Sequence, residues 1–415
     1  MSELPAVKSA PSADSLNSAV TARTPAGMAI ERPGEAGAEG RARFKDLVDA
    51  QMPRDFSISL DAYRRGGTDR FLDRIPEGLV AQPMAGFEKE YVNIIDYIVR
   101  ITHRIWEEKD IGYIYDTYSH DCAVWDDLGL QYGRDKIVAD TVQLNNAFPD
   151  IRIVADEVIW AGDDRLGFHT SHRTQIFGTN TGFSRYGAPS GRRVQFWCLA
   201  NCVARDNEIF QEHVVYDTVG LLQQLGVDAV YAAKQLGAAG ALGQLPPNFL
   251  ASDTKRSKGQ SKPPLCAIPS LPIENPGEFA RAALLTVWNR RNLAAMQRIY
   301  SPNVLVQATA GRVYHGIGQL QSFVLSMLAM FPDLHLSVDD VYWMGNAREG
   351  HLVAIRWSMI GTHGGNGRYG EPTGREVHLW GITHWIIDKG MVQKEWFMFN
   401  EFGLLIQLHR PSGAA

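Results

Sequence analysis

The sequence has few cysteines, little excess charge of either sign and no long hydrophobic run, and each shortage excludes a class of protein. Four cysteines in 415 residues, with no paired spacing, argue against a disulfide-rich secreted domain and favour a reducing compartment. A net charge of −5 gives no basic surface for nucleic acid or for an anionic membrane. No segment is long enough to span a bilayer, and the N-terminus has no apolar signal region. We therefore expect a cytoplasmic protein with neither a nucleic-acid nor a membrane partner.

No set of cysteines or histidines has the convincing spacing of a metal site. Cys198 and Cys202 lie four apart on a predicted strand, so they share a face but are too far apart to form a disulfide. His378 and His384 share a face of another predicted strand, near His363, but no third ligand has convincing spacing. We therefore predict no metal site and no cofactor.

A long segment of the chain occurs twice. The 79 residues from Phe148 to Gly226 match the segment that begins at Phe331 without a gap, at a constant offset of 183 residues, and 27 positions are identical. In the first copy, predicted strands from Arg192 to Arg205 and from Ile209 to Tyr216 flank the turn residues Asp206-Asn207. An internal repeat of this length predicts two domains of one fold.

Upstream of each repeated segment, apolar residues recur at helical spacing. This predicts a first helix at Phe87–Lys109 and its counterpart at Pro276–Arg290. Two shorter helices and then a curved antiparallel sheet follow in each copy, so the fold class is α+β. The expected organisation is a disordered tail at 1–40, an N-terminal extension at 41–86, a first domain at 87–226, a linker at 227–275 and a second domain at 276–410.

Short motifs recur at matching positions in the two copies. The second copy has Arg356, Gly361-Thr362-His363, Pro372-Thr373-Gly374-Arg375, Gly390, Glu395 and the sequence GLLIQL; the first has Arg173, Gly178-Thr179-Asn180, Pro189-Ser190-Gly191-Arg192, Glu212, Asp217 and GLLQQLG. In these motifs the chain resembles the SnoaL-like polyketide cyclase (ester cyclase) branch of the NTF2-like superfamily. The resemblance implies two tandem cone-shaped α+β barrels, each a bent sheet that wraps a long helix and leaves a deep apolar pocket.

The resemblance implies metal-free acid/base catalysis by an aspartate on the last strand, at the position of Asp217. An apolar cone would raise the pKa of this carboxyl by desolvation, which suits a general acid or base near neutral pH. Alternation places His213 on the same strand face, about 13 Å away, as a second catalytic candidate. The alternative is that Asp217 caps the helix beginning at Thr218, a role that Asn400 fits equally well in the second copy.

Other polar and aromatic residues are candidates for substrate binding. Asn180 and His363 stand at matching positions, and both can hydrogen-bond a carbonyl or hydroxyl group. Arg173 recurs as Arg356, and we expect it to pair with the recurring Glu212 rather than to bind a substrate. The remaining candidates are Trp125, Asp126, His169 and Trp197 in the first copy and His378, Trp380, His384 and Asn400 in the second.

The two copies differ at the position that the resemblance implies for catalysis, because Asn400 cannot exchange a proton as Asp217 can. We therefore expect the active pocket in the first copy, acting on an apolar oxygenated small molecule by cyclase, isomerase or dehydratase chemistry. The second copy would replace the second subunit of a homodimer, and further homo-oligomerisation stays open. The alternative is a non-catalytic protein that binds or carries a small molecule in its two cones.

Overall fold

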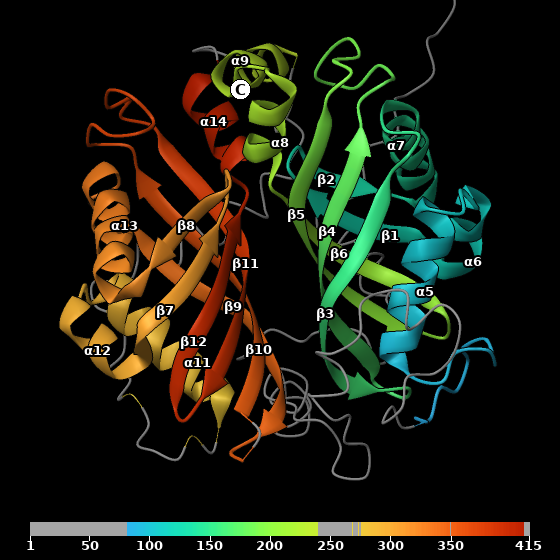
Figure 1. Ribbon diagram of the computed structural model, residues 1–415, viewed down its shortest axis with the longest axis horizontal. Coiled ribbons are helices and arrows are strands. Elements are labelled where there is room, and N and C mark those ends of the chain that lie inside the picture. Colours follow the sequence, from blue (N-terminus) through green and yellow to red (C-terminus); the bar gives the residue numbers. More distant parts are fainter. Residues whose placement is uncertain (1–80, 240–267, 269–272, 274, 349, 411–415) are drawn as a thin grey trace, which may run out of the picture. The chain divides into compact units, whose positions relative to one another are not determined.

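The computed structural model describes residues 81–239, 268, 273, 275–348 and 350–410, in which each repeat forms one six-stranded sheet with its own helices (Figure 1). The expected tail at 1–40, the start of the extension and most of the linker lie outside these ranges. Repeat one consists of α5 (Ile94–Trp106), η1 (Ile111–Tyr113), α6 (Ile114–Thr117), β1 (Tyr118–Asp126), β2 (Gly129–Tyr132), α7 (Arg134–Ala147), β3 (Arg152–Asp163), β4 (Gly167–Thr179), β5 (Arg193–Arg205), β6 (Glu208–Tyr216) and α8 (Thr218–Leu225).

Helix α9 (Ala229–Ala238) follows repeat one, and repeat two then has the same order of elements. It consists of α11 (Pro276–Leu284), the π-helical turn η2 (Leu285–Asn289), η3 (Leu293–Ala295), α12 (Met296–Ile299), β7 (Tyr300–Ala308), β8 (Arg312–His315), α13 (Gly316–Met330), β9 (His335–Asn346), β10 (Gly350–Thr362), β11 (Glu376–Asp388), β12 (Met391–Phe399) and α14 (Glu401–His409). The expectation of two copies of one α+β fold is confirmed.

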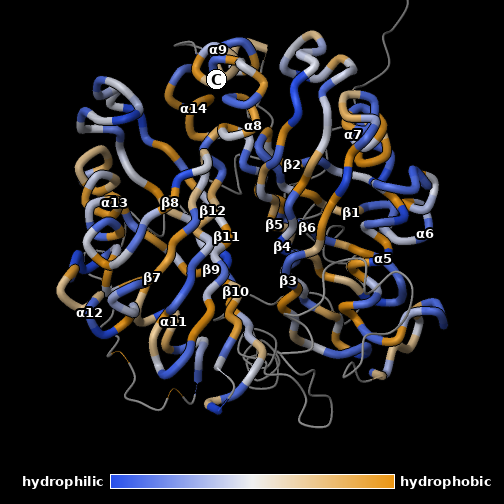
Figure 2. The backbone as a smooth tube through the Cα atoms, in the orientation of Figure 1, coloured by the Kyte–Doolittle hydropathy of each residue, from blue (hydrophilic) through white to orange (hydrophobic). Residues whose placement is uncertain are grey.

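The strand order is the same in both sheets: β2-β1-β6-β5-β4-β3 in repeat one and β8-β7-β12-β11-β10-β9 in repeat two. All neighbouring strands are antiparallel except β1 with β6 and β7 with β12. Each sheet therefore has two free edges, and the expected barrel is an open, bent sheet rather than a closed one. In Figure 2 the hydrophobic residues concentrate in the strands and in the helices that cover them.

The first helix begins later than its apolar pattern predicts. The side chain of Asn93 accepts a hydrogen bond from the backbone N–H of Asp96, which caps α5 at Ile94. Asn275 caps α11 in the same way through Glu278. Residues 87–93 continue the apolar pattern at helical spacing, but the capping residue Asn93 fixes the start of the helix after it. Periodicity alone therefore overestimates the length of the helix.

The tight turn between β5 and β6 forms as its residues predict. Asp206 and Asn207 both adopt positive φ angles, 52° and 67°, which short polar side chains tolerate and which match the twist of a two-residue hairpin. The Asn207 side chain also contacts Glu88, so the hairpin tip is held to the segment before α5.

The sheet of repeat one is buried on both faces. One face covers α5 and carries Phe196, Val214 and their apolar neighbours. The other face packs Leu199 and Val215 against Ile382 and Met398 of repeat two. Because both faces are apolar, the hydrophobic pattern of these strands does not reveal which face is the inner one.

The contacts between the repeats come in matched pairs. Trp197 packs edge-to-face on Trp396 with ring centroids 6.1 Å apart, and Trp380, the counterpart of Trp197, packs on His213, the counterpart of Trp396, at 5.8 Å. The counterparts of two residues that are in contact are thus also in contact with each other. This is the pattern of an isologous two-fold interface, formed here within one chain.

Aromatic side chains fill the interior of the repeat-two sheet. Phe397 stacks on Trp357 and Trp288 with centroids 4.7 and 5.7 Å apart, and it meets Phe323 edge-to-face at 5.6 Å. Tyr314 stacks on Phe323 at 4.9 Å. At the matching positions of repeat one stand mostly smaller or polar residues: Val214 for Phe397, Thr174 for Trp357, Asp140 for Phe323 and Gln131 for Tyr314. The two interiors have therefore diverged, one towards packing and one towards an open space.

Replacing Phe397 by alanine should destabilise repeat two by about 3 to 5 kcal/mol, because its ring lies at the centre of this stack and its loss leaves a cavity. Urea unfolding followed by tryptophan fluorescence measures this. The control is Phe183→Ala, whose ring is 69% exposed and whose loss should cost no more than about 0.5 kcal/mol. Equal effects of the two variants would contradict a packed aromatic interior.

Candidate active site

A cavity of about 180 Å³ lies inside repeat one, between its sheet and the helices α5 and α7. Strands β1, β4 and β5 contribute even-numbered positions to its wall. Strand β2 contributes Gln131 and β3 contributes Ile153, and β6 contributes Ile209 and then Glu212, Val214 and Tyr216. The apolar part of the lining includes Ile98, Ile101 and Ile105 of α5, Ile137 and Leu144 of α7, and Phe196 and Val214 of the sheet. The polar part includes Asp126, Asp127, Asp140, His172, Thr174, Arg185, Glu212, Tyr216 and Thr218. The site is thus an apolar pocket with several carboxyl groups.

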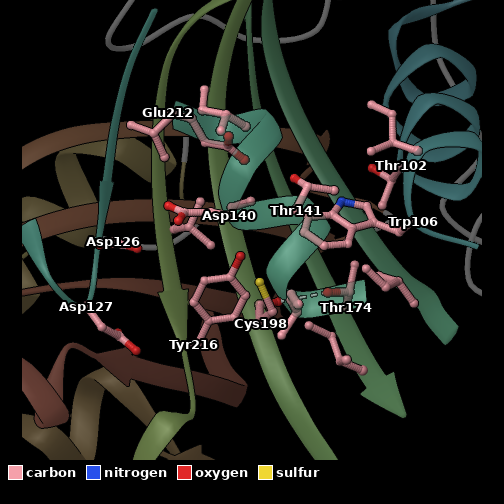
Figure 3. Close-up of a pocket in the computed structure, with 18 of the residues that line it drawn as sticks. Thr102, Trp106, Asp126, Asp127, Asp140, Thr141, Thr174, Cys198, Glu212 and Tyr216 are labelled. Atoms are coloured by element: carbon pink, nitrogen blue, oxygen red, sulfur yellow. Dashed lines mark hydrogen bonds between the residues drawn. The ribbon is translucent and has the colours of Figure 1, made fainter. Parts of the chain in front are cut away.

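Two adjacent carboxyl groups stand at the end of β1, where the chain turns into β2. Figure 3 shows Asp126 and Asp127 across the cavity from Thr102 and Trp106 of α5. Both side chains are buried, and both line the cavity although they are neighbours in sequence. This is possible because Asp127 follows the last residue of β1, where the strand alternation ends.

Asp126 is surrounded by polar groups. It accepts hydrogen bonds from the backbone N–H of Leu128 at 2.8 Å and from the side-chain amide of Gln131, and Arg185 lies 4.0 Å away. Burial raises the pKa of Asp126, whereas Arg185 and the Leu128 N–H act in the opposite direction. Its environment therefore favours the ionised form more than that of its neighbour does.

Asp127 has far fewer partners. The hydroxyl group of Thr218 donates a hydrogen bond to Oδ2, and Oδ1 has no hydrogen-bond partner among the described residues. Burial raises the pKa of Asp127 to about 8, and the neighbouring charge of Asp126 adds to the effect. At neutral pH this carboxyl is mostly protonated and can donate a proton or a hydrogen bond into the cavity.

Two further titratable groups face the same cavity. His172 is 4% exposed, its Nε2 has no partner among the described residues, and burial lowers its pKa to about 3, so the ring is neutral. Burial raises the pKa of Glu212 to about 7, and Glu212 accepts a hydrogen bond from Tyr118 at 3.1 Å. Glu395 in repeat two has the same raised pKa and a matching tyrosine partner, so the Tyr–Glu pair belongs to the fold rather than to the site.

The loop between β4 and β5 forms one wall of the cavity through Ser184, Arg185 and Tyr186. Arg185 lies 3.7 Å from Asp140 as well as near Asp126. Asn180 organises this loop: its amide donates hydrogen bonds to the backbone oxygens of Ala147 and Gly182, and its Oδ1 accepts one from Ser190. Asn180 is therefore a loop-positioning residue and does not line the cavity, and His363 takes a similar place beside Thr373 in repeat two.

Asp217 and His213, expected to be catalytic, do not line the cavity. Asp217 caps α8 through the N–H of Gly220, and it also accepts hydrogen bonds from the backbone N–H groups of Ala310 and Gly311 in repeat two, at 2.5 and 3.0 Å. Burial raises its pKa although these three donors act in the opposite direction. The predicted strand phase was wrong, because positions 212, 214 and 216 face the cavity and 213 and 215 face repeat two.

Most of the other candidates also lie between the repeats. His169 is 3.7 Å from Asp340, and His384 contacts Ser171 at 2.6 Å and Arg173 at 3.1 Å. Trp125 stacks on His213. Trp197, Trp380 and Asn400 contact the opposite repeat, and the backbone of His378 bonds to Gln407 of α14. Of all the candidates, Asp126 alone lines the cavity.

Arg173 does not pair with Glu212 as we expected. Its guanidinium group contacts Asp156 at 2.6 Å and Glu157 at 3.0 Å, and it lies over the ring of Trp396 at 3.4 Å. Arg356 pairs with Asp339 in the same way. The recurring arginine is structural, but its partners come from the neighbouring strand rather than from the last one.

One feature of the sequence that we did not use for prediction does indicate which residues line the cavity. Positions that are polar in repeat one and large and aromatic in repeat two, such as Asp140 with Phe323 and Thr174 with Trp357, lie inside the sheets. His172, opposite in phase to His169, is another member of the lining that sequence reasoning did not select. Within the described ranges, no group of three or more His, Cys, Asp or Glu side chains is arranged to hold a metal ion.

Solved structures resemble this chain only in part. A candidate SnoaL-like polyketide cyclase from Jannaschia sp. CCS1 is 16% identical, covers 31% of this chain and 90% of its own, and has a TM-score of 0.28. AclR, a candidate hydroxylase from Streptomyces galilaeus, is 25% identical, covers 32% of this chain and 86% of its own, and has a TM-score of 0.27. IdmH, a candidate polyketide cyclase from Streptomyces antibioticus, is 24% identical, covers 31% of this chain and 94% of its own, and has a TM-score of 0.27.

No curated protein matches the chain. None of the helices in the described part of the chain is both long enough and apolar enough to cross a membrane. The model of the SnoaL-like polyketide cyclase family, whose members bind small-molecule substrates, matches residues 97–225 and again residues 278–408, which together make up more than half of the chain. The chain therefore belongs to the SnoaL-like polyketide cyclase family, with two copies of the family fold in tandem.

Proposed function

We propose that repeat one is an acid/base enzyme whose proton transfers are carried by Asp126 and Asp127, in place of Asp217 and His213. The observation that supports this most directly is the unequal environment of two adjacent carboxyl groups in one cavity. Arg185, Gln131 and a backbone N–H surround Asp126, whereas the carboxyl group of Asp127 has Thr218 as its one hydrogen-bond partner among the described residues. Pairs of titratable groups whose surroundings separate their pKa values are typical of acid/base sites.

The two carboxyl groups would have different roles. Asp126, in its ionised form, removes a proton from a carbon next to a carbonyl group, and the electron pair of the C–H bond moves onto the carbonyl oxygen. Protonated Asp127 donates a hydrogen bond or its proton to that oxygen as negative charge develops there. Return of the proton from Asp126 to another atom gives an isomer. Attack by the enolate carbon on a second carbonyl group gives a ring, and the new alkoxide takes up that proton. Loss of a neighbouring hydroxyl group together with that proton, as water, gives dehydration.

The lining supports an apolar, oxygenated substrate without a free carboxylate. Twelve isoleucine, leucine and phenylalanine side chains contribute to the wall. Among the described residues that line it, four carboxyl groups outnumber the one guanidinium group, Arg185. A substrate carboxylate would be repelled by these groups, whereas a ketone or a phenol can accept or share their protons.

We also propose that repeat two takes the place of the second subunit of a dimer. The matched aromatic contacts between the repeats support this role, as does the filled interior of repeat two. A chain of this kind needs no homodimerisation to cover the outer face of its repeat-one sheet. Mass photometry at nanomolar concentration should find a monomer, and an obligate dimer would count against this role.

Filling the cavity tests whether it is the active site. Val214→Phe introduces the residue that repeat two has at the matching position, and its ring would occupy the cavity. We expect it to abolish the consumption of any compound that the wild-type protein removes from a metabolite extract, followed by untargeted mass spectrometry. Val214→Ala, which enlarges the same space, is the matched control and should retain turnover.

One observation favours the second candidate function, a binding or carrier protein. Asp217, at the position that the family resemblance implies for catalysis, is used as a helix cap and as a contact with repeat two. If no compound is consumed, but one co-purifies with the wild-type protein and with Val214→Ala and not with Val214→Phe, the cavity binds its ligand without chemistry.

A further inference from the structure

Repeat two reaches the turn that carries the carboxyl pair. Asn400 stands at the start of α14 and is 6% exposed. Its side-chain amide donates hydrogen bonds to the backbone oxygens of Asp126 at 3.4 Å and of Asp127 at 3.2 Å. Its Oδ1 accepts a hydrogen bond from the N–H of Gly403 at 2.6 Å, so the same side chain caps α14. One residue therefore links the helix to both aspartates.

The next residues of α14 contact a second wall of the cavity and are themselves held in place. Phe402 packs edge-to-face on Tyr186, which lines the cavity from the β4–β5 loop, with centroids 5.8 Å apart. Glu401 accepts hydrogen bonds from Arg312 at 2.5 Å and from Tyr369 at 2.8 Å. The first turn of α14 is thus fixed within repeat two while it supports two walls of the cavity in repeat one.

We propose that Asn400 and Phe402 of repeat two are positioning residues for the active site of repeat one, holding the Asp126–Asp127 turn and the Tyr186 loop against the cavity. This inference rests on the proposed function only in assigning the chemistry to that carboxyl pair. Neither residue touches the cavity itself. Their effect passes through backbone and ring contacts, as it does for groups that orient a catalytic side chain.

The geometry explains why the two copies carry different residues at this position. Asp217, the counterpart of Asn400, meets backbone N–H groups of Ala310 and Gly311, which require an acceptor. Asn400 meets two backbone oxygens, which require a donor. An aspartate at position 400 would set a carboxylate against these oxygens. The acid in one copy and the amide in the other therefore each fit the backbone groups that they meet, and the difference does not mark a lost catalytic group.

The test replaces Asn400 by serine, which can still cap α14 but is too short to reach the turn and adds no charge. The readout is the titration of the Asp127 carboxyl by ¹³C NMR, with the signal assigned through Asp127→Asn. The titratable and charged groups around this carboxyl are Asp126, Arg185, Tyr186, Cys198, Tyr216 and Asp217, and Thr218 is its hydrogen-bond donor; the substitution changes none of them. We expect the turn to open to water and the pKa of Asp127 to fall by at least about one unit, a tenfold change in its proton affinity.

The control is Met398→Ala, which removes packing between the repeats against Leu199 and Val215 without changing any contact of the turn. It should lower the melting temperature at least as much as Asn400→Ser and leave the Asp127 titration within about 0.3 units, a twofold change. An unmoved titration in Asn400→Ser, or an equal shift in both variants, overturns the proposal. Because the carboxyl is observed directly, the result does not depend on finding a substrate, whereas failure of the proposed function would appear as absent turnover with the titrations as expected.

Discussion

Asp127→Asn should lower turnover by about 10²- to 10⁴-fold, the usual contribution of a general acid or base. The amide keeps the shape of the carboxyl and can still accept the hydrogen bond from Thr218, so the fold is retained. It cannot give a proton to a developing enolate oxygen. The measurement is the initial rate of loss of whichever compound the wild-type protein consumes, at saturating and at low concentration, so that kcat and KM are separated.

Asp217→Asn is the matched control for this result. Asp217 is buried like Asp127 and stands at the position that the family resemblance implies for catalysis, but it contacts backbone N–H groups outside the cavity. Its amide variant should lose stability, because an N–H₂ group would face N–H donors, and should keep turnover within a few-fold. Loss of turnover in Asp217→Asn together with normal turnover in Asp127→Asn would reverse our assignment.

Relative to Asp127→Asn, the wild-type protein should lose stability between pH 4 and pH 8. Burial raises the pKa of Asp127 from 3.8 to about 8, so the folded state binds this proton more tightly than the unfolded state does. The stabilisation is complete below pH 4, declines as the unfolded state releases the proton, and is gone once pH passes the folded-state pKa. At about 1.4 kcal/mol per unit, the difference amounts to as much as about 6 kcal/mol.

Urea unfolding of the two proteins at several pH values between 4 and 9 measures this difference. Glu212 and Glu395 also have raised pKa values and contribute with the same sign, but they are unchanged in the variant and cancel in the comparison. The free energy of unfolding of the variant should therefore increase relative to that of the wild type as pH rises. A difference that does not vary with pH would mean that Asp127 is ionised normally and would remove the basis for its role as an acid.

The sequence by itself determined that the chain contains two copies of one α+β fold. The ungapped repeat, the hairpin residues Asp206 and Asn207 and the recurring motifs are local features, and they act over a few residues at a time. A capping residue, a tight turn or a periodic pattern of apolar side chains favours the same local structure whatever the arrangement of the rest of the chain. For that reason the helices and strands could be predicted, with errors mainly at their ends, as at Asn93.

The position of the cavity was decided by the tertiary structure. Strand alternation separates residues 213, 215 and 217 from 212, 214 and 216, but it does not say which set faces the cavity. A sheet with one solvated face would have shown this by its polar residues. Here repeat two covers the outer face, so His213 and Val215 are as buried as Glu212 and Val214, and the pattern carries no information about direction.

The same cause explains why most of the candidate residues do not line the cavity. Histidine, tryptophan and aspartate gathered on one strand face predicted a substrate site, because such residues are typical of binding walls. In this chain they form the contact between two copies, where buried polar groups must find partners and aromatic rings must pack. A sequence pattern can indicate that a residue is buried next to other polar residues. Only the arrangement of the two sheets decides whether those neighbours belong to a ligand or to the other half of the same chain.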